Sequence, residues 1–502
     1  MSTAYIAAVE ITVMNVALPT LSRALSAGTT ELQGVVDAYN LFLGAFVLAA
    51  GSLSDRQGRK GFLLLGMGIL GSASLVASWV DTSSALIAAR AVMGLGAALM
   101  FPTTLSILAN VFTGRRARAR AIGLWGASTG LGVATGPIVG GWLLSRYWWG
   151  SIFAFLALLT LAIAVLVVLF VPTSRDPRTP PIDWRGLSLS SLGLGAFVLG
   201  IIEAPRWGWG SASTIGCVTI GALLVLVFLA VQRRTEHPML DISLFSDMRY
   251  TAATGSIAIS FFALNGFIFL ITQYMQQVKD WSALSMGLRL LPMAGSIGIA
   301  SIVGAWLAVR IGNKVVVTAG LILFAVGLVW ASTNTQDTAY SFMSVNIIVL
   351  GLGFGLTSTP ATEAIMGAVS KEKAGVGAAV NDATRLCGAT LGVAVIGSMA
   401  SSLYRNKMDG TLPNRVTDAA SSDRSLGGAL AAADKLHSTG DVEGARQLSE
   451  AATSAFLHSM QGGSLLAAAA VSAGALMTGF LLPARPRQLD SSPDLAAQVV
   501  NP

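Results

Sequence analysis

The chain has 502 residues, of which 53% are apolar and 11% are Asp, Glu, Lys or Arg, and its mean hydropathy is +0.68. Soluble globular proteins carry about 25% charged residues, so the composition excludes a water-soluble enzyme of this length. The net charge of +7 does not indicate nucleic-acid binding, because the basic residues are spread over many short loops.

Apolar stretches long enough to cross about 30 Å of hydrocarbon recur along the chain and predict an all-α polytopic membrane protein with fourteen transmembrane helices. The first span begins at Met1 with no polar segment before it, which suggests that the natural chain begins further upstream. The predicted spans are residues 1–19, 32–50, 61–80, 85–112, 120–144, 152–171, 187–204, 213–232, 250–272, 284–309, 315–332, 341–360, 374–403 and 459–482.

The distribution of Lys and Arg predicts the orientation of these spans. The segments that follow the even-numbered spans hold 19 Lys and Arg. The short loops on the other side hold four, at positions 23, 146, 206 and 279. Cytoplasmic loops carry the excess of basic residues. Both termini are therefore expected in the cytoplasm, and the polar stretch 404–458 is expected outside, where it has helix-like amphipathic runs.

An internal repeat predicts the domain organisation. A shift of 254 residues places GSLSDRQGRK (51–60) over AWLAVRIGNK (305–314), with four identities, and both segments follow an equivalent span. The shift corresponds to eight spans, which indicates two six-helix halves separated by an inserted pair. The expected parts are an N-terminal bundle (1–172), a linker with two extra helices (173–249), a C-terminal bundle (250–482) and a cytoplasmic tail (483–502). Paired repeats commonly build transporters that bind substrate at their interface.

Four motifs in the predicted spans and loops resemble those of the major facilitator superfamily, and specifically of its fourteen-helix drug:proton antiporter family. They are the loop motif at 51–60, the arginine-centred motif at 86–96, the antiporter motif at 132–141 and the first-span pattern at 12–19. The resemblance implies a fold of two six-helix bundles plus two central helices. It also implies transport across the cytoplasmic (inner) membrane rather than catalysis.

The sequence departs from the family pattern at three places. Glu10 stands where the first-span pattern usually has Asp, Gly34 stands where a Trp is common, and Ser151 replaces the second Trp of a Trp-x-Trp pattern. The first departure keeps an acid. Because of the other two, the family pattern does not identify the substrate.

The loop motif predicts a cytoplasmic gate. Gly58 allows a tight reversal between two helices, and Asp55 can lie against a helix N-terminus and pair with a cation. In the family this cluster locks the cytoplasmic side in one conformation. The alternative is that its Arg and Lys residues only set the orientation of the chain in the membrane. The residues assigned to the gate are Gly51, Asp55, Arg56, Gly58, Arg59 and Lys60.

The antiporter motif predicts close helix packing. Gly132, Gly136 and Gly140 recur every four residues and therefore share one helix face, where another backbone can come close. Pro137 removes one backbone hydrogen bond and favours a kink, and Gly141 completes the motif. We expect this face to form the contact typical of antiporters without binding substrate itself.

Charged residues inside the spans are candidate functional groups, because each costs about 2.5–3.5 kcal/mol or more in the bilayer centre. Glu203, Arg289 and Glu363 lie near span ends and are expected to reach the interface, and Asp382 and Arg385 are spaced to neutralise each other. The eight residues are Glu10, Asp37, Arg90, Glu203, Arg289, Glu363, Asp382 and Arg385.

Asp37 and Arg90 are the first candidates for proton coupling. Each lies five residues inside the outer start of its span, at a depth of about 7–8 Å. A carboxylate whose cation partner can move away would load and release protons. The alternative is a static salt bridge. Glu10, near the middle of the first span, is the second candidate proton carrier or a docking charge for a cationic substrate.

No cofactor, nucleotide or metal site is expected. The phosphate-binding pattern G-x-x-x-x-G-K-[ST] is absent, which argues against direct ATP drive. His437 and His458 have no ligand spacing around them, and the two cysteines lie in apolar runs. The partners expected are therefore lipid, protons and a small-molecule substrate.

The sequence favours a proton-coupled antiporter that exports hydrophobic, cationic small molecules such as drugs, antibiotics or dyes. A transporter of the same fold for a metabolite, lipid or siderophore is an open alternative. An integral membrane transferase is a more distant one, because the antiporter motif and the lack of a convergent His/Asp/Glu set argue against it.

The orientation can be tested by cysteine labelling in intact cells. A cysteine placed at Arg424 should react with a membrane-impermeant reagent from outside, and a cysteine at Arg178 should react only after permeabilisation. External labelling at residue 178 in intact cells would reverse the orientation.

Overall fold

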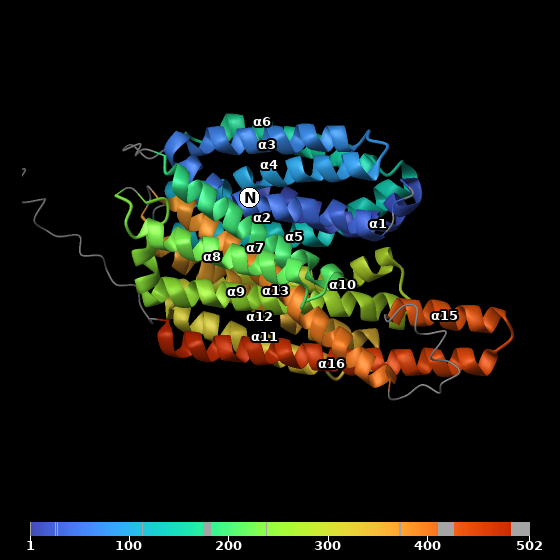
Figure 1. Ribbon diagram of the computed structural model, residues 1–502. Helices are drawn as coiled ribbons and strands as arrows, with labels where there is room; N and C mark the ends of the chain where they lie inside the picture. Colours follow the sequence, from blue (N-terminus) through green and yellow to red (C-terminus); the bar gives the residue numbers. More distant parts are fainter. Residues whose placement is uncertain are drawn as a thin grey trace, which may run out of the picture.

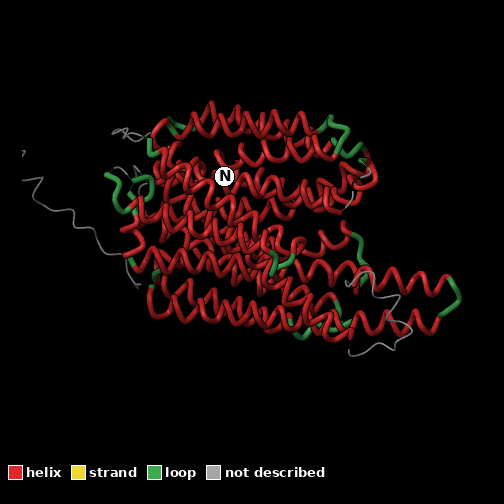
Figure 2. The backbone as a smooth tube through the Cα atoms, in the orientation of Figure 1, coloured by secondary structure: helices red, strands yellow, loops and turns green. Residues whose placement is uncertain are grey.

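The computed structural model describes residues 2–25, 27, 29–112, 114–173, 182–236, 238–370, 373–409 and 426–482. These residues form helices, turns and loops without a strand, as Figure 2 shows. Thirteen of the helices are long and apolar enough to cross a membrane by length and composition. The all-α membrane architecture expected from the sequence is confirmed.

The first six helices form the N-terminal bundle (Figure 1). In it α1 packs against α5, α4 packs against α2 and α3, and α6 covers α3. The bundle has its own buried core, which includes Met67, Leu70 and Met93. The helices are α1 (Ser2–Ala24), α2 (Thr29–Gln57), α3 (Arg59–Ala77), α4 (Ser83–Val111), α5 (Arg115–Arg146) and α6 (Ser151–Phe170).

Six later helices form the C-terminal bundle around a second buried core. In it α9 packs against α12, α13 and α16, and α12 also packs against α10 and α11. A π-helical turn, η2 (Tyr274–Val278), continues α9. The helices are α9 (Met248–Gln273), α10 (Ala283–Ile311), α11 (Asn313–Ala331), α12 (Tyr340–Ala368), α13 (Ala374–Asp409) and α16 (Val442–Leu481).

The two repeat segments have the same backbone turn. Gly58 alone links α2 to α3 with φ of 113°, and Gly312 alone links α10 to α11 with φ of 92°. Residues with a Cβ rarely adopt such angles. We call the end of the molecule that holds these two turns the basic end, because Arg59, Lys60 and Lys314 lie beside them, and the opposite end the far end.

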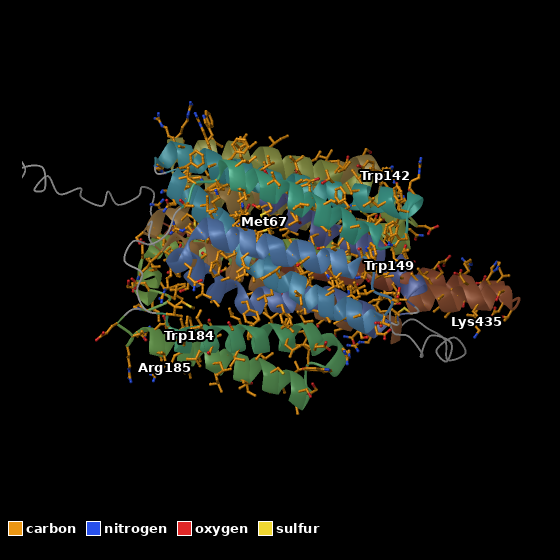
Figure 3. The ribbon with its side chains drawn as sticks, turned by 90° about the horizontal axis from the view of Figure 1, so that it is seen from above. Met67, Trp142, Trp149, Trp184, Arg185 and Lys435 are labelled. Carbon is orange, nitrogen blue, oxygen red and sulfur yellow. The ribbon has the colours of Figure 1, made fainter. Side chains whose placement is uncertain are left out.

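The inserted pair, α7 (Trp184–Trp207) and α8 (Ala212–Gln232), lies beside one junction between the bundles. The bundles meet along two seams, α2 with α13 and α5 with α10, and α7 packs against both α2 and α13. Figure 3 shows the pair at one side of the molecule, with Trp184 and Arg185 at the start of α7. One seam is therefore covered by the inserted helices.

A helical hairpin extends the far end. It consists of α15 (Leu426–Ser438) and the first half of α16, which pack together and project beyond the other helices in Figure 1. The 40 residues of α16 span about 60 Å, twice the thickness of the hydrocarbon. The stretch 404–458 expected outside includes the end of α13, which continues to Asp409, all of α15, and the first part of α16, which begins at Val442.

The first predicted span differs from the rest. Helix α1 has 23 residues and continues to Ala24, five residues beyond the predicted end of this span at residue 19. The other thirteen predicted spans each have a matching helix.

Candidate functional site

Asp55 joins the two bundles at the basic end. Its carboxylate accepts hydrogen bonds from the backbone N–H of Gly375, at 2.7 and 2.9 Å, and of Val376, at 3.1 Å. Both N–H groups belong to the first turn of α13, where the helix dipole favours an anion. Arg59 completes the arrangement with an Nη2–Oδ1 distance of 2.7 Å. We call these four residues the Asp55 clamp.

The other residues of the loop motif support this clamp. A side chain at Gly51 would collide with Gly375 and Ala379, so the glycine lets α2 and α13 approach closely. Lys60 donates a hydrogen bond of 2.9 Å to the carbonyl of Val168 in the last turn of α6, where a cation is favoured. Arg56 is half-buried in the last turn of α2.

A second set of polar residues joins the bundles at the basic end on the other seam. Glu363 of α12 is 1% exposed and accepts a hydrogen bond of 2.9 Å from Asn313. Arg118 of α5 lies 3.4 Å from it and Arg249 of α9 lies 3.7 Å from it. With Arg115 these residues form the Glu363 cluster. The expectation that Glu363 reaches the interface is wrong, because two arginines and an amide hold it inside.

Arg115 gives the second seam a polarity opposite to that of the first. Its Nη2 donates to the carbonyl of Ala308, at 3.0 Å, and to Asn313, at 3.2 Å. Ala308 lies in the last turn of α10, which favours a cation. One seam therefore has an anion on a helix N-terminus, and the other has a cation on a helix C-terminus. Both contacts join the two bundles at the basic end.

Arg90 pairs with Glu10 rather than with Asp37. The Arg90 guanidinium forms a buried ion pair with Glu10, donates a hydrogen bond of 2.9 Å to the carbonyl of Val35, and lies 4.5 Å from the ring centre of Tyr39. Both charged residues are 1% exposed. The pairing of Asp37 with Arg90 expected from their equal depth is wrong, because the Arg90 side chain is occupied by α1 and by the α2 backbone.

Asp37 instead faces the inserted helices. It is half-buried, and the charged group that acts on it is Glu203 of α7. Glu203 in turn lies 3.1 Å from Arg206, one turn further along α7. The structure therefore places two carboxylates and one cation at the contact of α2 with α7. Arg289, the other residue expected near a span end, lies over the rings of Trp281 and Tyr340.

Asp382 and Arg385 do not neutralise each other by direct contact. In the part of the chain that the structure describes, Arg385 donates a hydrogen bond of 2.8 Å to Thr362 and forms no ion pair with Asp382. Its guanidinium lies 4.7 Å from the ring centre of Trp125 on α5 and 5.2 Å from that of Phe261 on α9. Arg385 is thus a further contact between the bundles.

The glycines of the antiporter motif face two helices. A Cβ at Gly132 or Gly136 would press against backbone and side chains of α1, and one at Gly140 would press against Val13. On another side of α5, Gly141 lies against Leu284 and Pro137 against Gly287, both on α10. Helix α5 therefore fits closely between α1 and the opposite bundle.

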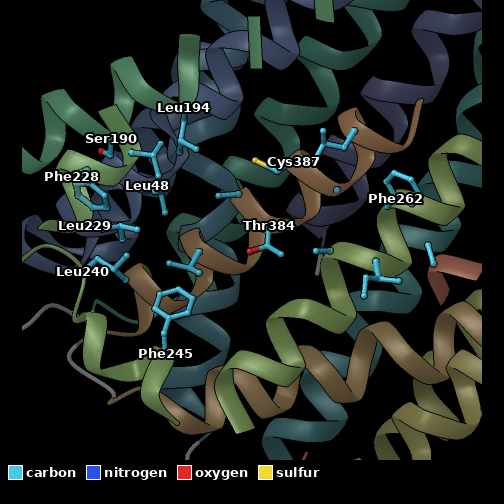
Figure 4. A pocket seen from close by; sticks show the side chains of 18 residues that line it. Leu48, Ser190, Leu194, Phe228, Leu229, Leu240, Phe245, Phe262, Thr384 and Cys387 are labelled. Atoms are coloured by element: carbon cyan, nitrogen blue, oxygen red, sulfur yellow. The ribbon is translucent and has the colours of Figure 1, made fainter. Parts of the chain in front are cut away.

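An apolar cavity of about 580 Å³ lies between the inserted pair and the C-terminal bundle. Figure 4 shows Leu48 of α2, Leu194 of α7, and Thr384 and Cys387 of α13 among the side chains that line it. Its wall carries no charged residue. Such a cavity can hold an apolar group of a ligand or a lipid chain.

Sequence reasoning missed the Glu363 cluster. Two of its arginines lie in the run TGRRARAR (113–120), which the sequence analysis assigns to topology, the third is Arg249 in another basic loop, and Asn313 follows directly on the turn glycine of the second repeat. A carboxylate three residues beyond a predicted span end, on the same side as such a basic run, is the signal that could have found it. In the described residues, no three His, Cys, Asp or Glu side chains gather as metal ligands would.

Comparison with known proteins gives a consistent result. The family model described as Major Facilitator Superfamily matches residues 1–393. The multidrug resistance protein Stp of Mycobacterium tuberculosis is 32% identical over 81% of this chain and 75% of its own length. The multidrug efflux pump LfrA of Mycolicibacterium smegmatis is 33% identical over 94% of this chain and 93% of its own.

A solved structure shares the fold. The crystal structure of the human organic anion transporter MFSD10 matches with a TM-score of 0.57 and covers 93% of this chain and 98% of its own. The identity is 13%. This likeness concerns the arrangement of helices alone.

The close contact of α5 with α1 can be tested with Gly132→Ala. The added Cβ would lie 2.7 Å from the carbonyl of Tyr5 and from the Cβ of Ala8, and overpacking of this kind costs about 1–3 kcal/mol. The midpoint temperature of unfolding of the purified protein should fall. Gly216→Ala on α8 is the control, because a Cβ there meets nothing within 4 Å and alanine favours a helix. Equal midpoints for the two variants would contradict the contact.

Proposed function

Because the chain belongs to the major facilitator superfamily, we propose that it is an antiporter that exports hydrophobic, cationic small molecules such as drugs and dyes in exchange for protons. The observation that carries this proposal is the Asp55 clamp, a buried carboxylate of one bundle held by the helix N-terminus of the other. Its hydrogen bonds would form together when the bundles meet and break together when they separate. The proposal needs no cofactor and no enzymatic step, and the proton gradient supplies the driving force.

The proposed orientation has the basic end in the cytoplasm of a cell whose cytoplasmic membrane holds the protein. Both chain termini would then be cytoplasmic, and the α15–α16 hairpin would lie outside. In that orientation the Asp55 clamp and the Glu363 cluster, which join the bundles at the basic end, would close the protein to the cytoplasm. Opening this end would admit substrate from inside.

The clamp and the cluster are suited to a reversible closure. Each contact consists of a few charge-assisted hydrogen bonds, and one such bond contributes about 1.5–3 kcal/mol. Binding of a substrate or a proton can supply a free energy of this size. The bundles can therefore separate at the basic end without disturbing their own apolar cores, which lie on either side of the seams.

Two carboxylates of the N-terminal bundle are the proposed proton carriers. Glu10 has one oxygen, Oε2, without a hydrogen-bond partner among the described residues, although its other oxygen pairs with Arg90. Arg90 keeps the Val35 carbonyl and the Tyr39 ring if Glu10 takes up a proton. Asp37 has Glu203 as its charged neighbour and thus gains from neutralisation.

The proposed substrate class follows from the same residues. Carboxylates within the spans favour a cation, and the apolar cavity beside the seam between α2 and α13 favours a hydrophobic body. Two relatives are named a multidrug resistance protein and a multidrug efflux pump. Proton-gradient-dependent uptake of dyes and antibiotics into inside-out vesicles tests the proposal. Uptake of a single metabolite and of no drug would favour the same-fold alternative.

The gate is tested with Asp55→Asn. The variant lacks the negative charge that the α13 N-terminus and Arg59 bind, so export should fall about tenfold or more while the protein stays in the membrane. Gly58→Leu should have a similar effect, because φ of 113° is strained for leucine. Asp434→Asn on the exposed face of α15 is the matched control. Near-normal export by both gate variants would reduce the loop to a topology signal.

Proton coupling is tested with Asp37→Asn. If Asp37 carries a proton, the variant should lose substrate-driven proton release and uphill export but still bind substrate. Asp81→Asn, at an exposed aspartate between α3 and α4, is the control. Proton release is measured with a pH dye in proteoliposomes. Should Asp37→Asn still concentrate substrate at a normal rate, Asp37 is a structural charge and Glu10 becomes the carrier.

A further inference from the structure

The seam between α2 and α13 has a regular register. Asp55 contacts Gly375 at the basic end, Gly51 lies against Ala379, and deeper in the membrane Gly44 lies against Leu386. The helices run antiparallel, so each step back along α2 matches an equal step forward along α13. Residues 375, 379, 382 and 386 share one face of α13. The register therefore places Asp382 on the seam, at the level of Leu48.

Asp382 is enclosed there without a bonded cation. Its side chain is 7% exposed, and Oδ2 has no hydrogen-bond partner in the part of the chain that the structure describes. The other oxygen accepts a hydrogen bond of 3.3 Å from Asn381. Arg385, one turn further on, is directed to Thr362 and to the ring of Trp125. A bare carboxylate in this position is costly, whereas a neutral carboxyl is not.

The helices packed against α13 leave Asp382 without another bonded cation among the described residues. On α2, Asp55 is bound at the basic end, and on α4 the one span charge, Arg90, is bound to Glu10. Arg249 of α9 and Glu363 of α12 bind each other.

The remaining charges lie further away. Glu203 and Arg206 pair near the far end of α7, and Glu443, Arg446 and Glu450 pair on the projecting half of α16. Arg385 is the charged group that acts on Asp382 through space.

We propose that Asp382 is a proton-binding site whose protonated, neutral form is required for closure of the seam between α2 and α13 when no cationic substrate is bound beside it. When the seam opens at the basic end, water reaches Asp382 and the carboxyl releases its proton to that side. When the seam closes, the carboxylate must first take up one proton. The direction of net transport rests on the proposed function, but the dependence of closure on a proton does not.

Two labelled positions report the opening of the basic end. Gly61 on α3 and Val315 on α11 each follow the turn glycine of their repeat by three residues, a Cβ at Gly61 meets nothing within 4 Å, and Val315 is 51% exposed. Spin labels are attached to cysteines at both positions, with Cys217 and Cys387 replaced by serine. The distance between the labels is measured by electron paramagnetic resonance in lipid nanodiscs from about pH 5 to pH 9, the range that buried carboxyls reach.

The expected result is a closed population at low pH that converts to an open one as pH rises. Asp382→Asn should stay closed across the whole range, and Asp382→Glu should keep the response with a shifted midpoint. Asp337→Asn, an exposed aspartate at the far end, is the matched control and should behave as the parent. The profile from size-exclusion chromatography and the Asp382→Glu response establish that the labelled protein is folded.

Other outcomes overturn the inference. A pH response in Asp382→Asn equal to that of the parent would place the proton elsewhere. An Asp382→Asn variant that is open at every pH would show that the charged carboxylate supports the closed seam. Dye export by the same proteins in proteoliposomes tests the proposed function separately. A chain that opens with pH yet exports nothing would refute that function and keep the proton site.

Discussion

A charge that leaves water for the interior of a membrane protein has to be neutralised, and this constraint governs the arrangement described above. Most charged groups within the spans are neutralised by an ion pair or by hydrogen bonds. Arg90 has Glu10, Glu363 has arginines from two helices, and Asp55 has the dipole and N–H groups of α13. These partners come from different helices and in two cases from different bundles. Neutralisation of charge and contact between the bundles are thus the same event at the basic end.

The two seams meet this constraint in opposite ways, although the repeats are related. Gly58 and Gly312 keep the same turn in both halves, yet the acid of the first repeat at Asp55 corresponds to Val309 in the second. The second seam therefore cannot place an anion on a helix N-terminus. Arg115 on the carbonyl of Ala308 takes over the contact from the other side. The two repeats therefore keep the same backbone turn, but an anion makes the contact at one seam and a cation makes it at the other.

The sequence predicts the spans well and the pairing of charges poorly, and the reason is geometric. Hydropathy reports depth along each helix, and this was enough to predict the thirteen helices. The loop motif predicted the turn at Gly58. Depth does not report the direction in which a side chain leaves its helix or which neighbour it meets. Asp37 and Arg90 share a depth, but Arg90 is directed to α1 and Asp37 to α7. The prediction that Arg385 pairs with Asp382, made from their spacing along one helix, is wrong for the same reason, because Thr362 and Trp125 on other helices contact Arg385.

The inserted pair makes the two seams mechanically unequal. Helix α7 packs against both α2 and α13, and Gly44 of α2 lies against side chains of both α13 and α7. At the basic end the same seam is held by the directed bonds of Asp55, which are lost over a short displacement. Apolar contacts at mid-depth are not directional, so they tolerate a small rotation. In the proposed opening, separation of α2 from α13 would therefore begin at Asp55 and pivot about the region of Gly44, under the cover of α7.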